Sequence, residues 1–155
     1  MLQLTKRTEY GLIALVHMVD RAGEFVSVRE IGDRYPVPRR LLAEVLKDLQ
    51  RANLLESQRG ALGGYQLARP ADQIALSEVI AAIEGTPSLT SCETLGAATD
   101  GACEVESTCP IRSPIHRVRK HFWDLMQHTT LRSLASPEPN HTPGLPLHAS
   151  REPAT

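Results

Sequence analysis

Aromatic residues are scarce in this chain, at 4% of 155 residues, and neither sign of charge is in excess. Aliphatic side chains must therefore fill the core of what we expect to be one domain with an appendage. The formal net charge of -1 gives no overall positive field that would indicate a nucleic-acid partner. Charge is uneven along the chain, however, because residues 86–112 are acidic and residues 113–135 are basic.

Long hydrophobic runs are also missing, and none would span a membrane. The apolar stretch after Lys6 and Arg7, "GLIALVHMV", is short and contains His17, so we do not interpret it as a signal peptide. We expect a cytoplasmic protein in which free thiols stay reduced. No nucleophile–base pair, phosphate-binding loop or paired carboxylates stand out, which argues against an enzyme.

Cysteine is rare, and an odd total of three argues against a disulfide scaffold. Cys92, Cys103 and Cys109 all lie in "SCETLGAATDGACEVESTCPIR", with ten and five residues between them. Thiolates select zinc, copper(I) or iron–sulfur clusters. Structural zinc sites usually have closer cysteine pairs, so these spacings favour a cluster. One alternative is a zinc site that His116 completes. The other is that the three thiols are inert.

Hydrophobic periodicity predicts a fold that is mainly α with a small β-hairpin. A first helix is expected over residues 5–21, with Thr5 as its N-cap and His17 as a structural histidine. The stretch "SVRE", starting at Ser27, has the form of a capping box, and the following "YPVP" must end the short helix that it opens. A third helix is expected between Pro38 and Asn53.

A β-hairpin is predicted around "RGALGG", because Leu55 and Ser57, then Tyr65 and Leu67, alternate as in strands. Its three glycines suit positive φ angles. A helix follows over "LSEVIAAIEG", a longer one should start at Pro114, and "TTLRSLA" adds a last turn. The expected division is a winged helix-turn-helix domain (1–85), a cysteine loop (86–112), a dimerisation helix with a short last turn (113–135) and a disordered tail (136–155).

The order of these elements is that of a winged helix-turn-helix, which indicates DNA binding. In that fold the second helix of the pair enters the major groove with its N-terminal residues at the base edges. Arginine suits guanine edges or phosphates, and glycines at a hairpin tip permit close approach. The alternative is a solvated charged face, and Tyr65 could equally be a core residue. The candidate DNA-binding residues are Ser27, Pro38, Arg39, Arg40, Lys47, Arg59, Gly60, Gly63, Gly64 and Tyr65.

A single winged helix contacts one half-site, so specific binding normally needs a dimer. The predicted long helix has an apolar face that little else in the chain could cover, and such faces tend to find a partner. We therefore expect a homodimer on double-stranded promoter DNA. The alternative is that the face packs only on its own domain. The expected interface residues are Ile115, Val118, Phe122, Leu125 and Met126.

These stretches resemble the Rrf-type winged-helix regulators, the family of IscR, NsrR and RirA. "LTKRTEYGLIALVHM" is similar to the opening helix of that family, "RGALGGYQLARP" to its wing, and the cysteine loop with "CPIR" and the long helix to its sensor end. The resemblance covers about residues 1–135. It implies a cytoplasmic homodimer that binds promoter DNA and carries an iron–sulfur cluster, either 2Fe–2S or 4Fe–4S.

The resemblance also implies ligands for the cluster. Cys92, Cys103 and Cys109 would bind iron, and the fourth ligand varies among members. Arg112 occupies the position of a histidine ligand found in some of them. Glu9 matches the acidic residue that others supply from the partner subunit, and His116 is the second candidate. Glu9 could equally be a carboxylate that is favoured near a helix N-terminus.

The function that follows is an iron–sulfur-sensing repressor. The ending "CEVESTCPIR" is most similar to regulators of iron–sulfur assembly operons, and stress-response genes are also possible targets. Pro38, Arg39 and Arg40 replace small polar residues of that pattern, so the operator sequence does not carry over. The alternatives are a zinc-bound or cluster-free winged-helix regulator and, from another class, a redox or cluster-carrier protein without DNA binding.

Overall fold

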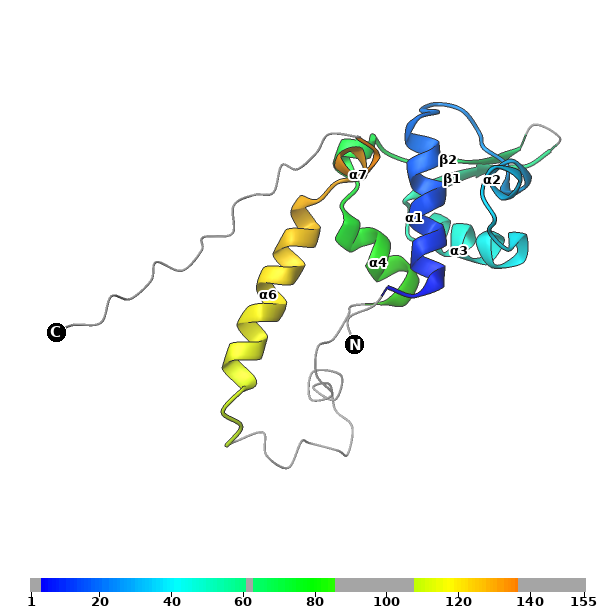
Figure 1. Ribbon diagram of the computed structural model, residues 1–155. Coiled ribbons are helices and arrows are strands. Elements are labelled where there is room, and N and C mark those ends of the chain that lie inside the picture. The colour runs from blue at the N-terminus through cyan, green and yellow to red at the C-terminus, as the bar shows by residue number, and fades with distance from the viewer. Residues whose placement is uncertain (1–3, 61–62, 86–107, 137–155) are drawn as a thin grey trace.

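The computed structural model describes residues 4–60, 63–85 and 108–136 (Figure 1). Within them it confirms a mainly helical fold with one antiparallel hairpin. The predictions for Cys92, Cys103 and the tail lie outside these residues. No helix among them is long and apolar enough to cross a membrane. The elements in chain order are α1 (Lys6–Val19), α2 (Val28–Arg34), α3 (Arg39–Arg51), β1 (Leu55–Gln58), β2 (Gly64–Leu67), η1 (Ala71–Gln73), α4 (Leu76–Glu84), α6 (Arg112–His128) and α7 (Leu131–Ala135).

Helix α1 is the central helix of the domain and contacts α3, α4 and α7 (Figure 1). Thr5 caps it as predicted, because its side chain accepts a hydrogen bond from the Thr8 amide. The buried face contains Leu15 and Met18, whereas Val16 is only half-buried. Gly11 permits the close packing, since a Cβ there would lie 2.7 Å from Ile83 Cδ1.

The α2–turn–α3 unit forms as the sequence predicts, although only one half of the predicted capping box is present. Ser27 Oγ accepts a hydrogen bond from the Glu30 amide at 3.1 Å and caps α2. The Glu30 carboxylate contacts Arg21 and lies 3.4 Å from His17 Nε2. His17 Nδ1 lies 3.3 Å from the Tyr35 hydroxyl, so this buried histidine links α1 to the turn before α3.

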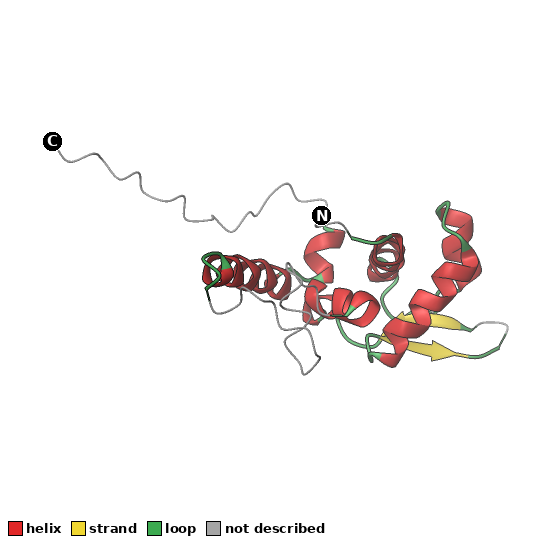
Figure 2. Ribbon diagram, turned by 90° about the horizontal axis from the view of Figure 1, so that it is seen from below, coloured by secondary structure: helices red, strands yellow, loops and turns green. Residues whose placement is uncertain are grey.

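The predicted hairpin forms, and its register places Ser57 opposite Tyr65. Its glycines correct the prediction of three positive φ angles. Gly60 has a φ of 114°, but Gly63 and Gly64 are not in the left-handed region. A Cβ on Gly64 would lie 2.4 Å from the Val26 carbonyl oxygen, so the absence of a side chain there serves the protein's own packing. Figure 2 shows the two strands side by side.

Helix α6 begins at Arg112, two residues before the predicted start at Pro114. A proline in the first turn is compatible with a helix because the first amides have no intrahelical acceptor. The chain then returns to the domain, where the Leu131 amide donates to the Ile74 carbonyl at 3.0 Å. Leu131 is fully buried in the core, while most of α6 extends away from it (Figure 1).

Candidate nucleic-acid interface

The N-terminal end of α3 presents two arginines in different environments. Pro38 is the N-cap residue in extended conformation, which starts the helix without a side-chain cap. Arg39 is hydrogen-bonded to Asp33, and its aliphatic part lies over Gly32, where a Cβ would be 2.8 Å from Arg39 Cγ. Arg40 has 95% of its side chain exposed. Arg39 therefore holds α2 and α3 together, and Arg40 is the better placed to contact a ligand.

A groove of about 580 Å³ separates the exposed side of α3 from the hairpin. It brings together the predicted residues Lys47 and Arg59 with Arg51, which the prediction did not include. Arg40, Lys47 and Arg51 are spaced seven and four positions apart, so they lie along one helix face. The same spacing, read from the sequence, would have identified Arg51 as a further candidate DNA-binding residue. The groove is lined by Ser27, Val28, Lys47, Gln50, Arg51, Ser57, Gln58, Arg59, Gly63, Gly64 and Tyr65.

Tyr65 combines the two roles that the sequence left open. Its backbone exchanges hydrogen bonds of 2.8 and 2.9 Å with Val26, which adds a third extended segment beside the hairpin. Its half-buried ring packs against the core and also lines the groove. Ser27, at the same end of the groove, uses its hydroxyl to cap α2.

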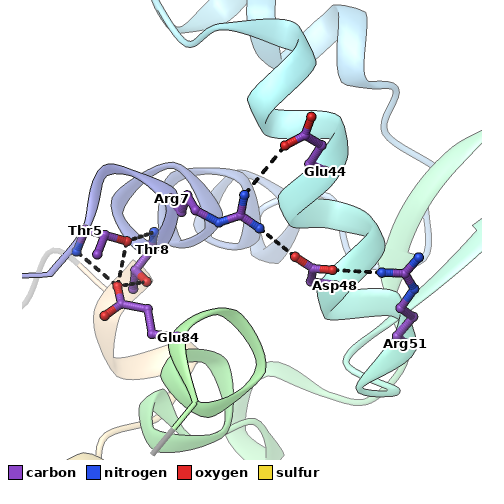
Figure 3. Close-up of polar contacts among 7 residues, drawn as sticks. All are labelled: Thr5, Arg7, Thr8, Glu44, Asp48, Arg51 and Glu84. Carbon is purple, nitrogen blue, oxygen red and sulfur yellow. Dashed lines mark hydrogen bonds and ion pairs between the residues drawn. The ribbon is translucent and has the colours of Figure 1, made fainter. Parts of the chain in front are cut away.

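Two carboxylates of α3 lie between the basic face and α1 (Figure 3). Arg7 Nη2 is 2.7 Å from Asp48 Oδ2, and Arg7 Nη1 is 3.6 Å from Glu44 Oε2. The same carboxylates contact arginines of the basic face. Arg51 Nη1 lies 3.1 Å from Asp48 Oδ1, and Arg40 Nε lies 3.6 Å from Glu44 Oε1. The sequence did not reveal this network, because it depends on how α1 and α3 are packed.

The first turn of α1 is also linked to the end of α4 (Figure 3). Glu84 Oε1 accepts hydrogen bonds from the Thr5 amide at 3.0 Å, from the Thr5 hydroxyl at 2.7 Å and from the Thr8 hydroxyl. Burial by itself would raise the pKa of Glu84. The hydrogen bonds from Thr8 and Thr5 outweigh that effect and lower the pKa below its usual value.

The candidate metal ligands are only partly described. Cys109 is free and partly exposed, so its thiol is available as a ligand just before α6. Glu9 lies in the first turn of α1 and pairs with Lys6 at 2.5 Å. His116 is exposed on α6, beside a surface cavity of about 360 Å³ that Arg112 and other residues line. Cys92 and Cys103 lie outside the described residues. In the described part of the chain, no three His, Cys, Asp or Glu side chains gather as a metal site.

The expected interface residues on α6 divide into two groups. Met126 is buried, at 4% exposure, so it belongs to the core of its own domain. The other four form one apolar stripe with Ile111, which the prediction omitted. The spacing of four, three, four and three residues is that of a helix that packs along another helix. This α6 stripe consists of Ile111 (58% exposed), the half-buried Ile115, Val118 (56%), Phe122 (39%) and Leu125 (49%).

These features define the class of protein, a winged-helix DNA-binding module with a projecting helix. Residues 4–137 match the family model Rrf2, described as iron-dependent transcriptional regulator, and the chain belongs to this family. It is therefore a transcriptional regulator and not an enzyme.

Three relatives illustrate the match. Protein aau3 of Rhizobium meliloti (strain 1021) is 29% identical over 138 residues, which are 89% of this chain and 88% of the relative. The structure of CymR, the global cysteine regulator of B. subtilis, matches with a TM-score of 0.71 at 26% identity. This match covers 87% of the present chain and 97% of the CymR chain. T. potens IscR matches with a TM-score of 0.63 at 25% identity, over 86% of the present chain and 85% of the IscR chain.

Proposed function

We propose that this regulator is a homodimer that binds promoter DNA, senses an iron–sulfur cluster and represses iron–sulfur assembly or stress-response genes. The observation that carries the proposal is the basic face of α3 with Arg40, Lys47 and Arg51, together with the groove that Lys47 and Arg51 line with Arg59 of the hairpin. The family description, iron-dependent transcriptional regulator, supports the sensing role.

The DNA would lie across α3 and the hairpin. Arg40, at the exposed N-terminal end of α3, would reach base edges in the major groove. Lys47 and Arg51, further along the same face, would contact phosphates, which supply most of the affinity. Arg59 precedes Gly60 at the hairpin tip and would follow the neighbouring backbone.

The dimer would form along the α6 stripe. Most of the stripe is exposed in the single chain, and burying it against a second copy would remove apolar surface from water. Two copies would then present two basic faces, as a two-fold symmetric operator requires.

The cluster would be held by Cys92, Cys103 and Cys109, with Glu9 of the partner subunit as the proposed fourth ligand and His116 as the second candidate. Thiolate sulfur is the donor that iron–sulfur clusters require, and the free thiol of Cys109 fits this role. A cluster with only three cysteine ligands is labile, which suits a sensor. Gain or loss of the cluster would change the population of dimers able to bind DNA.

The test is the absorption spectrum of anaerobically purified protein, together with its iron and acid-labile sulfide content. We expect a coloured protein that contains both elements and a Cys103→Ala variant that loses them. A colourless wild type without iron contradicts the sensing role.

A second candidate is a cluster-free or zinc-bound regulator, which the similarity to a cysteine regulator favours. Zinc without sulfide in the same preparation would establish it, and DNA binding would persist. A redox or cluster-carrier protein, by contrast, would show no preference for any DNA sequence.

A further inference from the structure

The first turn of α1 lies between the end of α4 and the recognition helix α3 (Figure 3). We propose that this turn couples the cysteine segment to DNA affinity, by controlling whether Arg7 shares Glu44 and Asp48 with Arg40 and Arg51 or leaves these carboxylates to them alone. The inference concerns the regulation of the proposed DNA-binding site, and it therefore rests on the proposed function.

The first half of the coupling is the link between α4 and α1. Glu84 is the last residue of α4, and Gly85 leads directly into the segment that contains Cys92. One oxygen of Glu84 accepts three hydrogen bonds from Thr5 and Thr8. Thr5 is the N-cap of α1, so a displacement of the α4 end either moves the first turn of α1 or breaks these bonds.

The second half is a competition for two carboxylates. Arg7, in that first turn, bridges Asp48 and Glu44. Each carboxylate has one further arginine partner, Arg51 for Asp48 and Arg40 for Glu44. With Arg7 in place, the charges of Asp48 and Glu44 are largely neutralised, and the side chains of Arg51 and Arg40 remain 76% and 95% exposed.

Withdrawal of Arg7 would leave each carboxylate with a single arginine. Arg40 would then neutralise Glu44 instead of contacting base edges, and Arg51 would neutralise Asp48 instead of a phosphate. Exposed ion pairs contribute little to folding stability, so the switch would cost the protein little. Its effect on DNA binding is larger, because contacts to DNA are lost. Each lost phosphate contact also reduces the slope of log affinity against log salt concentration by about 0.9.

The first experiment replaces Arg7. The probe is the duplex that the wild type selects from a random-sequence library, titrated at several salt concentrations. We expect Arg7→Gln to weaken binding about 10-fold and to reduce the salt slope by about one, the share of the Arg51 phosphate contact. Arg7→Lys should keep part of the affinity, since lysine offers a charge without the two-sided geometry.

The matched controls separate competition from overall charge. Arg7→Gln combined with Asp48→Asn should regain affinity, because Arg51 is released. The double variant Arg7→Gln with Asp72→Asn has the same net charge as the first one, but it changes an exposed carboxylate on η1. Its DNA affinity should therefore stay at the level of Arg7→Gln. An unchanged salt slope in Arg7→Gln, or equal recovery in both double variants, overturns the proposal.

The second experiment tests the link to the sensor. We expect Glu84→Ala to bring the ratio of affinities of cluster-loaded and cluster-free protein close to one, with normal iron and sulfide content. Glu78→Ala removes a carboxylate of the same helix that pairs with Arg69 instead, and it should keep the wild-type ratio. A Glu84→Ala variant that also keeps that ratio contradicts this inference alone. A wild type that selects no duplex, or that binds equally in both forms, contradicts the proposed function and the inference with it.

Discussion

At the scale of single residues, the glycines of the hairpin do two different things. Gly60 adopts a positive φ in open space, which is a backbone requirement of the turn. Gly63 and Gly64 instead lie where any Cβ would collide with backbone atoms, 2.3 Å from the Gln58 carbonyl oxygen and 2.4 Å from that of Val26. Hence the glycines of "RGALGG" serve folding as well as the proposed approach to DNA.

Gly64→Ala should therefore destabilise the domain. The new Cβ would separate β2 from Val26 and weaken the paired hydrogen bonds at Tyr65, at a cost of about 1–3 kcal/mol. Thermal or urea unfolding measures the loss. Gln66→Ala in the same strand removes only an exposed contact to Glu56 and should change stability by less than about 0.5 kcal/mol. Equal effects of the two substitutions would contradict the account of Gly64.

Glu84 predicts a pH dependence of stability. Its pKa is lowered in the folded protein, so the ionised form stabilises the fold, fully above the ordinary pKa of 4.5. That contribution is lost as the pH falls from there through the folded pKa. The free energy of unfolding, measured from about pH 6 to about pH 3, where carboxyl groups titrate, should therefore fall more steeply in wild type than in Glu84→Gln. Glutamine keeps a hydrogen-bond acceptor but does not titrate. Identical pH profiles would show that the threonine contacts do not depend on the charge.

At the scale of elements, α3 has one face for the core and one for a ligand. Leu42, Val45, Leu46 and Leu49 are fully buried, and Arg40, Lys47 and Arg51 follow the opposite side. The carboxylates Glu44 and Asp48 border these basic residues and offset part of their positive charge.

Arg40→Ala should weaken binding to the selected duplex about 10-fold or more, the usual cost of one lost arginine contact to a base. Its salt slope should change by no more than about one. Arg132→Ala removes the same charge from α7, away from this face, and should bind almost as the wild type does. If both variants bind equally well, Arg40 has no special role.

The α6 stripe gives a prediction about assembly. Val118→Glu places a charge among the exposed apolar residues and should convert dimer to monomer in sedimentation experiments at micromolar concentration. Gln127→Glu adds the same charge on another face of α6 and should remain a dimer. A wild type that sediments as a monomer, or a Val118→Glu variant that stays dimeric, would contradict the proposed interface.

The sequence predicted these elements well where the signal was local. The caps at Thr5 and Ser27 and the hairpin around "RGALGG" follow from residues that are near one another in the chain. It failed where packing between distant segments decides. The contact of Glu84 with Thr5 joins residues 79 positions apart, and the burial of Met126 depends on how α6 approaches the domain.

At the scale of the whole molecule, the described parts form a continuous path. The cysteine segment follows Glu84, Glu84 holds the first turn of α1, and Arg7 in that turn contacts the carboxylates of α3. Cys109 lies at the other end of the cysteine segment, just before α6 and its apolar stripe. Gain or loss of the proposed cluster would therefore act on both the proposed dimer interface and the proposed DNA-binding face.

The most direct test of the central claim is a DNA titration by anisotropy at one fixed salt concentration. The same anaerobic preparation would be measured with its cluster and after removal of the cluster by a chelator. The account predicts affinities for the selected duplex that differ by about 10-fold or more, in the range of typical allosteric couplings. Equal affinities of the two forms would contradict the claim that this regulator senses an iron–sulfur cluster.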